Sequence, residues 1–235
     1  WDSQTTRLRG HASGHYLSAI AQAYAGSVHD ERMHADFKRK MDYMIDVLHD
    51  LSQLSGKPNA PESQFNADPV NVPPGPGRDG YTSDLSADGI RTDYWNWGKG
   101  FISAYPPDQF NMLEKCATYG GRNDQILAPH YTLHKILAGL LDCYEIGRNE
   151  KALDVATGMS LWVHARLRRV PTETRIRMWN RYIAGEFGGM NEAMARLYRI
   201  TDDERFLECA QMFDNIDFFF GDADHAHGLA RNVDT

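Results

Sequence analysis

The chain has 235 residues, 42% of them hydrophobic and 24% charged, which is typical of a globular domain with a substantial core and not of a disordered segment. The formal net charge of -7 argues against a nucleic-acid partner, because phosphate binding normally needs a clustered basic surface. No stretch approaches the roughly 18 consecutive apolar residues of a membrane span, no signal peptide is visible, and the scattered Cys116, Cys143 and Cys209 are too few for a disulfide framework.

The first predicted elements are two helices joined by a short loop. Apolar residues recur every three or four positions over residues 17–24 and again over residues 33–51. Ahead of them, the stretch Arg-Gly-His-Ala-Ser-Gly-His (residues 9–15) sets His11 and His15 four residues apart. If this stretch opens the first helix, both imidazoles face one side of it.

An irregular insertion follows over residues 56–99, where proline, glycine, asparagine and aspartate dominate. A loop of this length is either functional or mobile. Its tail carries Tyr94, Trp95 and Trp97, which are costly to leave in water. We expect the tail to fold back over a cleft, or alternatively to plug the ends of helices.

The rest of the chain is a second helical block with an internal repeat. Three-to-four spacing of apolar residues predicts helices over residues 133–144, 153–167, 190–197 and 206–213. The pattern Tyr144-x-Ile146 followed by Glu150 recurs as Tyr198-x-Ile200 followed by Glu204. Recurring helical hairpins predict a solenoid or a closed ring, because one hairpin alone cannot bury its apolar face. No segment alternates with period two, which argues against a large sheet.

The dense basic run of Arg166, Arg168 and Arg169 is predicted to be the end of a helix that meets solvent. Cations at that end complement the helix dipole.

His130 and His134 repeat the spacing of the first histidine pair at the start of another predicted helix. Two helix starts that present polar rings toward one space indicate a pocket, although each histidine alone is as well explained as a core or capping residue. A zinc site needs further ligands, and no His-Glu-x-x-His motif is present. We therefore assign no metal to these residues.

A third group of polar residues joins a loop to the next helix. Glu186, Asn191 and Glu192 flank the paired glycines of residues 188–189, which let the backbone pass close to a neighbour. The three side chains either hydrogen-bond sugar hydroxyls at a pocket rim or, for Glu192, complement the helix dipole.

Four segments of the chain resemble glycoside hydrolase families 127 and 146, the β-L-arabinofuranosidases and their relatives. They are residues 8–19, which include the two histidines, residues 100–106, residues 131–144, which begin Tyr-Thr-Leu-His-Lys, and residues 188–198, which begin Gly-Gly-Met-Asn-Glu. The resemblance implies an all-α fold, part of an (α/α)6 barrel built from helical hairpins. It also implies that residues 1–235 are the N-terminal part of the catalytic barrel, whose partners are the C-terminal remainder of the barrel and β-sandwich domains.

The implied function is retaining hydrolysis of β-L-arabinofuranosyl or related plant-derived sugars. In the family a cysteine nucleophile is held on zinc by further cysteines and a glutamate, and another glutamate is the acid/base. None of the three cysteines matches that motif, so we expect the zinc, the nucleophile and the acid/base beyond Thr235 and the isolated chain to be inactive. His134 matches a sugar-contacting histidine of the family best. The residues assigned to substrate binding are His11, His15, Trp97, His130, His134, Glu186, Asn191 and Glu192.

Two alternatives remain at this point. One is another (α/α)-barrel carbohydrate enzyme that uses a pair of carboxylates. The other is a non-catalytic helical-repeat binding module, for which the internal repeat is the support.

Overall fold

The computed structural model describes residues 8–56, 66–72, 93–117, 128–181 and 187–215. Within these ranges every regular element is helical, which confirms the all-α prediction. None of the described helices is both long and apolar enough to cross a membrane. The α-helices are α1 (His11–Gly26), α2 (Glu31–Ser52), α4 (Asp108–Glu114), α5 (Pro129–Glu145), α6 (Glu150–Leu167), α7 (Thr172–Arg181), α8 (Gly188–Thr201) and α9 (Glu204–Met212), and η2 (Pro69–Asn71) and η4 (Tyr94–Asn96) are short 3-10 helices.

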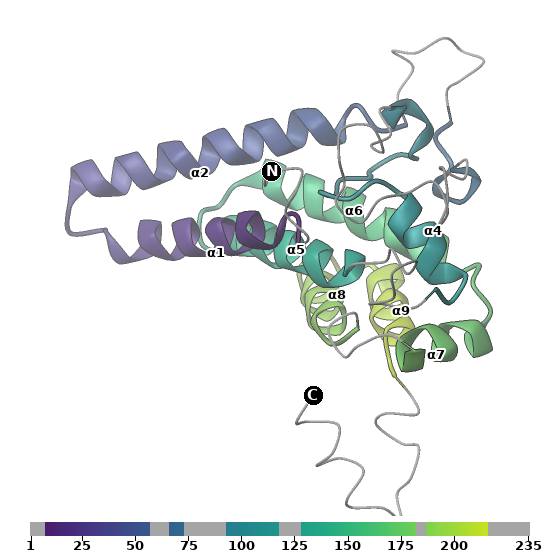
Figure 1. The fold of residues 1–235 in the computed structure, drawn as a ribbon. Coiled ribbons are helices and arrows are strands. Elements are labelled where there is room, and N and C mark those ends of the chain that lie inside the picture. Colours follow the sequence, from purple (N-terminus) through teal and green to yellow (C-terminus); the bar gives the residue numbers. More distant parts are fainter. Residues whose placement is uncertain (1–7, 57–65, 73–92, 118–127, 182–186, 216–235) are drawn as a thin grey trace, which may run out of the picture.

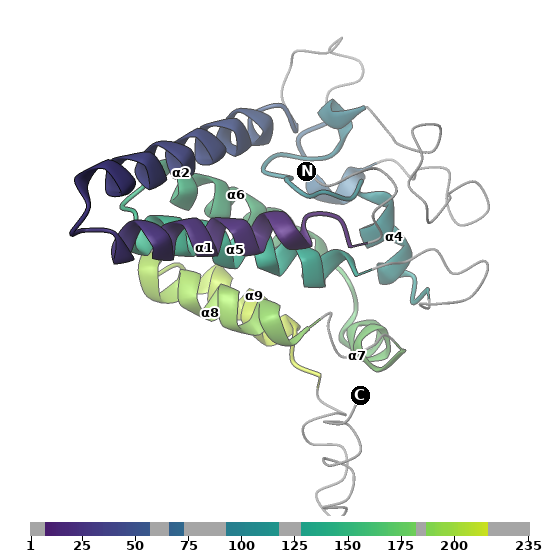
Figure 2. The ribbon, with the colours of Figure 1, turned by 60° about the vertical axis from the view of Figure 1, so that its left-hand side comes forward.

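Six of the helices form three consecutive hairpins in two layers. Each of α1, α5 and α8 pairs with the helix that follows it in the hairpin, namely α2, α6 and α9. Helix α5 also lies between α1 and α8, and α6 lies between α2 and α9 (Figures 1 and 2). The result is a wall of the α/α-barrel type, with α1, α5 and α8 as one layer and α2, α6 and α9 as the other.

The core fills the space between the layers with the residues whose spacing predicted the helices. Leu17 of α1, Ile136 of α5 and Leu197 of α8 are fully buried, as are Met41 and Ile45 of α2. A stripe of this kind on each helix buries enough apolar surface to stabilise a hairpin only when the next hairpin covers it.

Helices α1 and α5 approach each other closely because glycines face each other there. A Cβ atom added to Gly14 would lie 2.3 Å from the carbonyl carbon of Lys135, and one added to Gly139 would lie 2.6 Å from the carbonyl oxygen of Gly14. No side chain larger than hydrogen fits at such distances, so the contact between the two helices depends on these glycines.

The internal repeat appears in the structure as two equivalent hairpin turns. Arg148 and Asp202 both have a left-handed backbone, with φ of 53° and 56°. The residue after each one caps the next helix: Asn149 Oδ1 accepts a hydrogen bond from the amide of Ala152, and Asp203 Oδ1 accepts one from the amide of Arg205. Such caps stabilise helix starts by about 1 kcal/mol each.

Helices α5 and α8 are also joined by an ion-pair network. Arg196 of α8 donates to Asp142 at 2.5 Å and to Glu145, both on α5. The side chains of Arg196 and Asp142 are partly shielded from solvent, at 22% and 17% exposure.

The prediction for the arginine run is confirmed for Arg168 and Arg169, which are exposed at the end of α6, and is wrong for Arg166. The side chain of Arg166 is only 5% exposed and makes a two-pronged ion pair with Glu114 of α4, with 2.7 Å from Nε to Oε1. It also donates to the carbonyl of Pro69 at 2.7 Å and to Asn111. Arg166 thereby ties α4 and residues 66–72 to α6.

Helix α7 was not predicted from the apolar spacing because it carries few apolar residues. Met178 and Trp179 are its buried anchors, and Trp179 Nε1 donates to the carbonyl of Met212 at 3.0 Å.

Candidate active site

The first turns of α1 and α5 bring together His11, His15, Tyr131 and His134, which we call the histidine cluster. The rings of His11 and His15 have centroids 4.6 Å apart, as their four-residue spacing predicts. The ring of His11 stacks on Tyr131 at 5.4 Å, and its Nε2 lies 3.2 Å from the Tyr131 hydroxyl. Tyr131 in turn meets the edge of His134 at 5.6 Å. The cluster is partly exposed, so a ligand can reach it.

Helix α8 reaches the cluster through Gly189. A Cβ atom at this position would lie 2.3 Å from Nε2 of His134, so the absence of a side chain leaves room for the imidazole. The N-terminal turns of α1, α5 and α8 therefore meet at the same end of their layer.

The electrostatics of the site favour a neutral His134. Burial is the largest cause that lowers its pKa, to about 4, and the positive charge of Lys135 acts in the same direction. At neutral pH the imidazole therefore has one nitrogen that donates and one that accepts a hydrogen bond. That pairing suits a sugar hydroxyl, which can both accept and donate.

Tyr131 is the member of the cluster that the sequence analysis did not select. It contacts both His11 and His134, and the ammonium of Lys135 lies 5.1 Å from the centre of its ring. The available signal was its position three residues before His134, which places both side chains on one face of α5.

The structure does not bring His130 into the cluster. His130 is 2% exposed and lies among the rings of Phe110, Trp179 and Phe213, with centroid distances of 5.0, 5.9 and 5.1 Å. Burial lowers its pKa to about 3, and Arg166 acts in the same direction. Its surroundings are those of a core histidine.

The remaining sequence-predicted residues are spread over different places. Asn191 donates to the carbonyl of Ala210 at 2.7 Å and to Asp214 at 2.8 Å, so its amide faces α9. Glu192 is exposed on α8, and Glu186 lies outside the described residues.

Trp97 packs over α6 and not beside the histidines. Its ring contacts Phe101 at 5.4 Å, its Nε1 donates to Asp93 at 3.2 Å, and its carbonyl accepts from Trp162 Nε1 at 2.7 Å. These contacts pack the aromatic tail against α6.

The described residues do not fit a zinc site with thiolate ligands. Within the described ranges no three His, Cys, Asp or Glu side chains are grouped so that they could hold a metal ion. Burial raises the pKa of Cys143 to about 12 and also raises that of Cys209, which keeps both thiols protonated.

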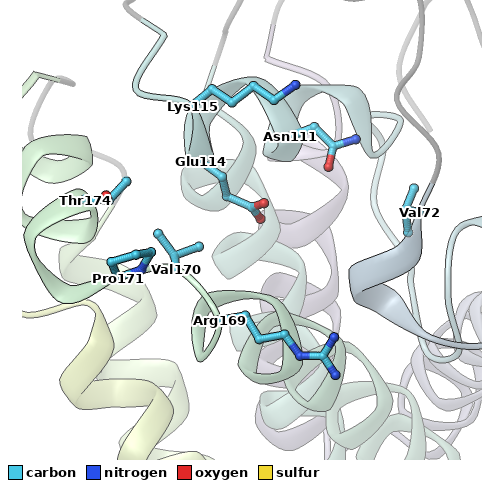
Figure 3. A pocket seen from close by; sticks show the side chains of 8 residues that line it. All are labelled: Val72, Asn111, Glu114, Lys115, Arg169, Val170, Pro171 and Thr174. Atoms are coloured by element: carbon cyan, nitrogen blue, oxygen red, sulfur yellow. The ribbon is translucent and has the colours of Figure 1, made fainter.

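A hollow of about 530 Å³ lies between α4, the start of α7 and Val72 (Figure 3). Figure 3 shows the side chain of Glu114 pointing from α4 into this space, above Arg169. The carboxylate of Glu114 is engaged by Arg166, as described above. We therefore regard this hollow as part of the structural network and not as a reaction site.

Comparison with protein-family models finds one that is described as "Beta-L-arabinofuranosidase, GH127 catalytic domain" and matches residues 1–229. No curated protein matches the chain.

Proposed function

Since the chain belongs to the family of GH127 β-L-arabinofuranosidase catalytic domains and is thus a glycoside hydrolase that acts on arabinofuranosides, we propose that its histidine cluster binds the terminal β-L-arabinofuranosyl group. His134 contacts the sugar hydroxyls in this proposal, and Tyr131, His11 and His15 form the adjoining wall.

The observation that carries this proposal is the convergence of polar rings at one end of the α1, α5 and α8 layer. The neutral imidazole of His134 and the hydroxyl of Tyr131 offer hydrogen-bond donors and acceptors, which suits the hydroxyls of a sugar. Gly189 lets the backbone of α8 pack directly against the imidazole of His134, which fixes its position. The cluster contains no carboxylate, so its proposed role is to bind and orient the sugar.

We further propose that hydrolysis retains the anomeric configuration, as the family resemblance implies. Cys143 and Cys209 are unsuited as nucleophiles because their thiols are buried and stay protonated. Proton NMR of the first product formed from an aryl β-L-arabinofuranoside tests this directly. The β-anomer is expected first, and initial release of the α-anomer would contradict retention.

In the full-length enzyme, replacing His134 by alanine is expected to lower kcat/KM for an aryl β-L-arabinofuranoside by about tenfold to a hundredfold, because a sugar hydroxyl loses its partner in the site. The exposed His29, in the turn between α1 and α2, provides the control: His29→Ala should keep kcat/KM unchanged. Because the pKa of His134 is lowered to about 4, the loss should be the same from pH 5 to pH 8. A loss that appears only above pH 6.5 would mean that His134 changes its protonation state near that pH. This result would contradict the proposal that the imidazole is neutral from pH 5 to pH 8.

Replacing Gly189 by alanine is expected to lower kcat/KM about tenfold by pushing the His134 imidazole out of place, since the new Cβ would lie 2.3 Å from its Nε2. The neighbouring Gly188 is a matched control, because a Cβ there meets nothing within 4 Å. Kinetics and thermal unfolding of both variants should be measured together. Equal activities in the two variants would mean that the position of His134 does not matter for binding.

A further inference from the structure

A second and larger groove lies away from the histidine cluster, along the outward side of α6. Its volume is about 1250 Å³, and it is lined by the C-terminal end of α2, by one side of α6, by residues near Gly100 and by Arg205 at the start of α9. A single small ligand typically occupies a pocket of about 300–1000 Å³. The groove therefore has room for more than one sugar ring.

The floor of the groove is formed where backbone meets backbone. A Cβ atom at Gly100 would lie 2.3 Å from the carbonyl oxygen of Gly158, and Gly100 has a left-handed backbone with φ of 86°. A larger residue at Gly100 would separate the two chain segments. Neither glycine places a side chain in the groove.

The groove is lined by more cations than carboxylates although the chain as a whole carries a net charge of -7. Lys99, Arg168, Arg169 and Arg205 line it, and Asp154 is the carboxylate among the lining residues that the structure describes.

Several of these charges are already paired by groups beside the groove. Arg205 is held by Asp203 at 2.5 Å, and Arg169 lies 3.7 Å from Asp68. His164, which also lines the groove, lies 2.6 Å from Glu208. These pairs account for two of the four cations.

Arg168 and Lys99 make no ion pair with any residue in the described ranges, and both are exposed. Asp154 cannot neutralise Arg168, because their separation along α6 corresponds to about 21 Å of helix. Two cations in the groove are thus available to an incoming anion.

The groove also offers neutral hydrogen-bonding groups beside these cations. Gln53 is exposed at the end of α2, and Thr157 is partly exposed on α6. An amide and a hydroxyl can bind the hydroxyls of a sugar, while a guanidinium binds a carboxylate with two parallel hydrogen bonds. A long nucleic acid is a poor fit, because the net negative charge of the chain would repel it.

We propose that this groove is an accessory site for an acidic saccharide, whose carboxylates on different sugar rings are bound by Arg168 and by Lys99 and whose hydroxyls contact Gln53 and Thr157. The inference uses the carbohydrate substrate class of the family and does not depend on the role proposed for His134. It gives the enzyme a second contact with an extended, uronate-bearing glycan.

The test is isothermal titration calorimetry of the purified enzyme with digalacturonate, with the neutral disaccharide galactobiose and with inorganic phosphate. Digalacturonate should bind, more weakly as salt is raised, and galactobiose should bind at least about tenfold more weakly. Arg168→Glu and Lys99→Glu should each weaken digalacturonate binding by at least about tenfold.

The matched control is Arg32→Glu, which makes the same charge change on an exposed residue in the first turn of α2, about 30 Å of helix from Ser52. This variant should bind digalacturonate as the unmodified enzyme does. His134→Ala should also bind it normally, which separates this site from the proposed active site. Hydrolysis of a small neutral arabinofuranoside should be unchanged in Arg168→Glu.

Several results would overturn the proposal. Binding of phosphate without binding of digalacturonate would show a site for free phosphate in place of an acidic sugar. Digalacturonate binding that survives both charge reversals would place the ligand elsewhere. No binding would leave Arg168 with only its role at the negative end of the α6 dipole.

Discussion

Replacement of Arg166 by methionine is expected to lower the free energy of unfolding by about 3 kcal/mol, the lower end of the range for breaking a buried ion pair. Arg166 is 5% exposed and Glu114 is 19% exposed, so the carboxylate left behind would be only partly rehydrated. The same change removes the hydrogen bond to the Pro69 carbonyl at 2.7 Å and the contact of the guanidinium with the Trp162 ring at 5.0 Å. Urea unfolding followed by circular dichroism measures the loss.

Arg169→Met is the matched control, three positions further along the chain. Its side chain is 58% exposed and lies 3.7 Å from Asp68, so its loss should cost less than about 1 kcal/mol. A double variant, Arg166→Met with Glu114→Gln, should recover part of the stability because no lone carboxylate remains. If Arg166→Met and Arg169→Met unfold at the same urea concentration, the buried network does not hold α4 to α6.

Replacement of Gly14 by alanine is expected to destabilise the protein by about 3 kcal/mol, the upper end for overpacking. In an isolated helix the same change would be stabilising by about 1 kcal/mol, because alanine is the better helix former. Here the sign is reversed, since the new Cβ would lie 2.3 Å from the backbone of Lys135, and backbone cannot rotate away as a side chain can. The midpoint temperature of thermal unfolding should fall. The rate of arabinofuranoside hydrolysis should fall with it, because α1 and α5 carry the histidine cluster.

Gly26, in the last turn of α1, is the control for this substitution. A Cβ atom there meets nothing within 4 Å, so Gly26→Ala should be neutral or stabilising by up to about 1 kcal/mol. A Gly14→Ala variant that is as stable as Gly26→Ala would contradict the close approach of α1 and α5.

The helices that carry regular apolar stripes were predictable from the sequence, and the interpretation as a glycoside hydrolase is confirmed by the family match. Spacing of three and four residues is a strong local signal when a helix buries one face, as α2 and α9 do. Helix α7 lacks that signal, because it is anchored mainly by Met178 and Trp179. Its place depends on contacts with distant parts of the chain.

The candidate site was only partly predictable for a similar reason. Four-residue spacing correctly placed His11 beside His15, since both lie on one helix. The same spacing gave no information about what surrounds His130, which is enclosed by Phe110, Trp179 and Phe213 from three other parts of the chain.

The burial of a charged side chain, as at Arg166, was also not predictable from local sequence. A basic run near the end of a helix is usually solvated, and Arg168 and Arg169 are. Arg166 lies two residues before Arg168, and its buried side chain is bound by Glu114 and by the carbonyl of Pro69. Which of three neighbouring arginines is buried follows from partners that are distant in sequence.

The ion pairs between α5 and α8 bear on how copies of a repeated hairpin keep their order. Asp142 and Arg196 occupy equivalent positions, each two residues before the tyrosine that marks the repeat, yet they carry opposite charges and bind each other. Two identical copies of either hairpin would place like charges at this position and repel. A difference at one position between two similar hairpins can thus determine which hairpin packs against which. A chain built from similar units then folds with its hairpins in one spatial order.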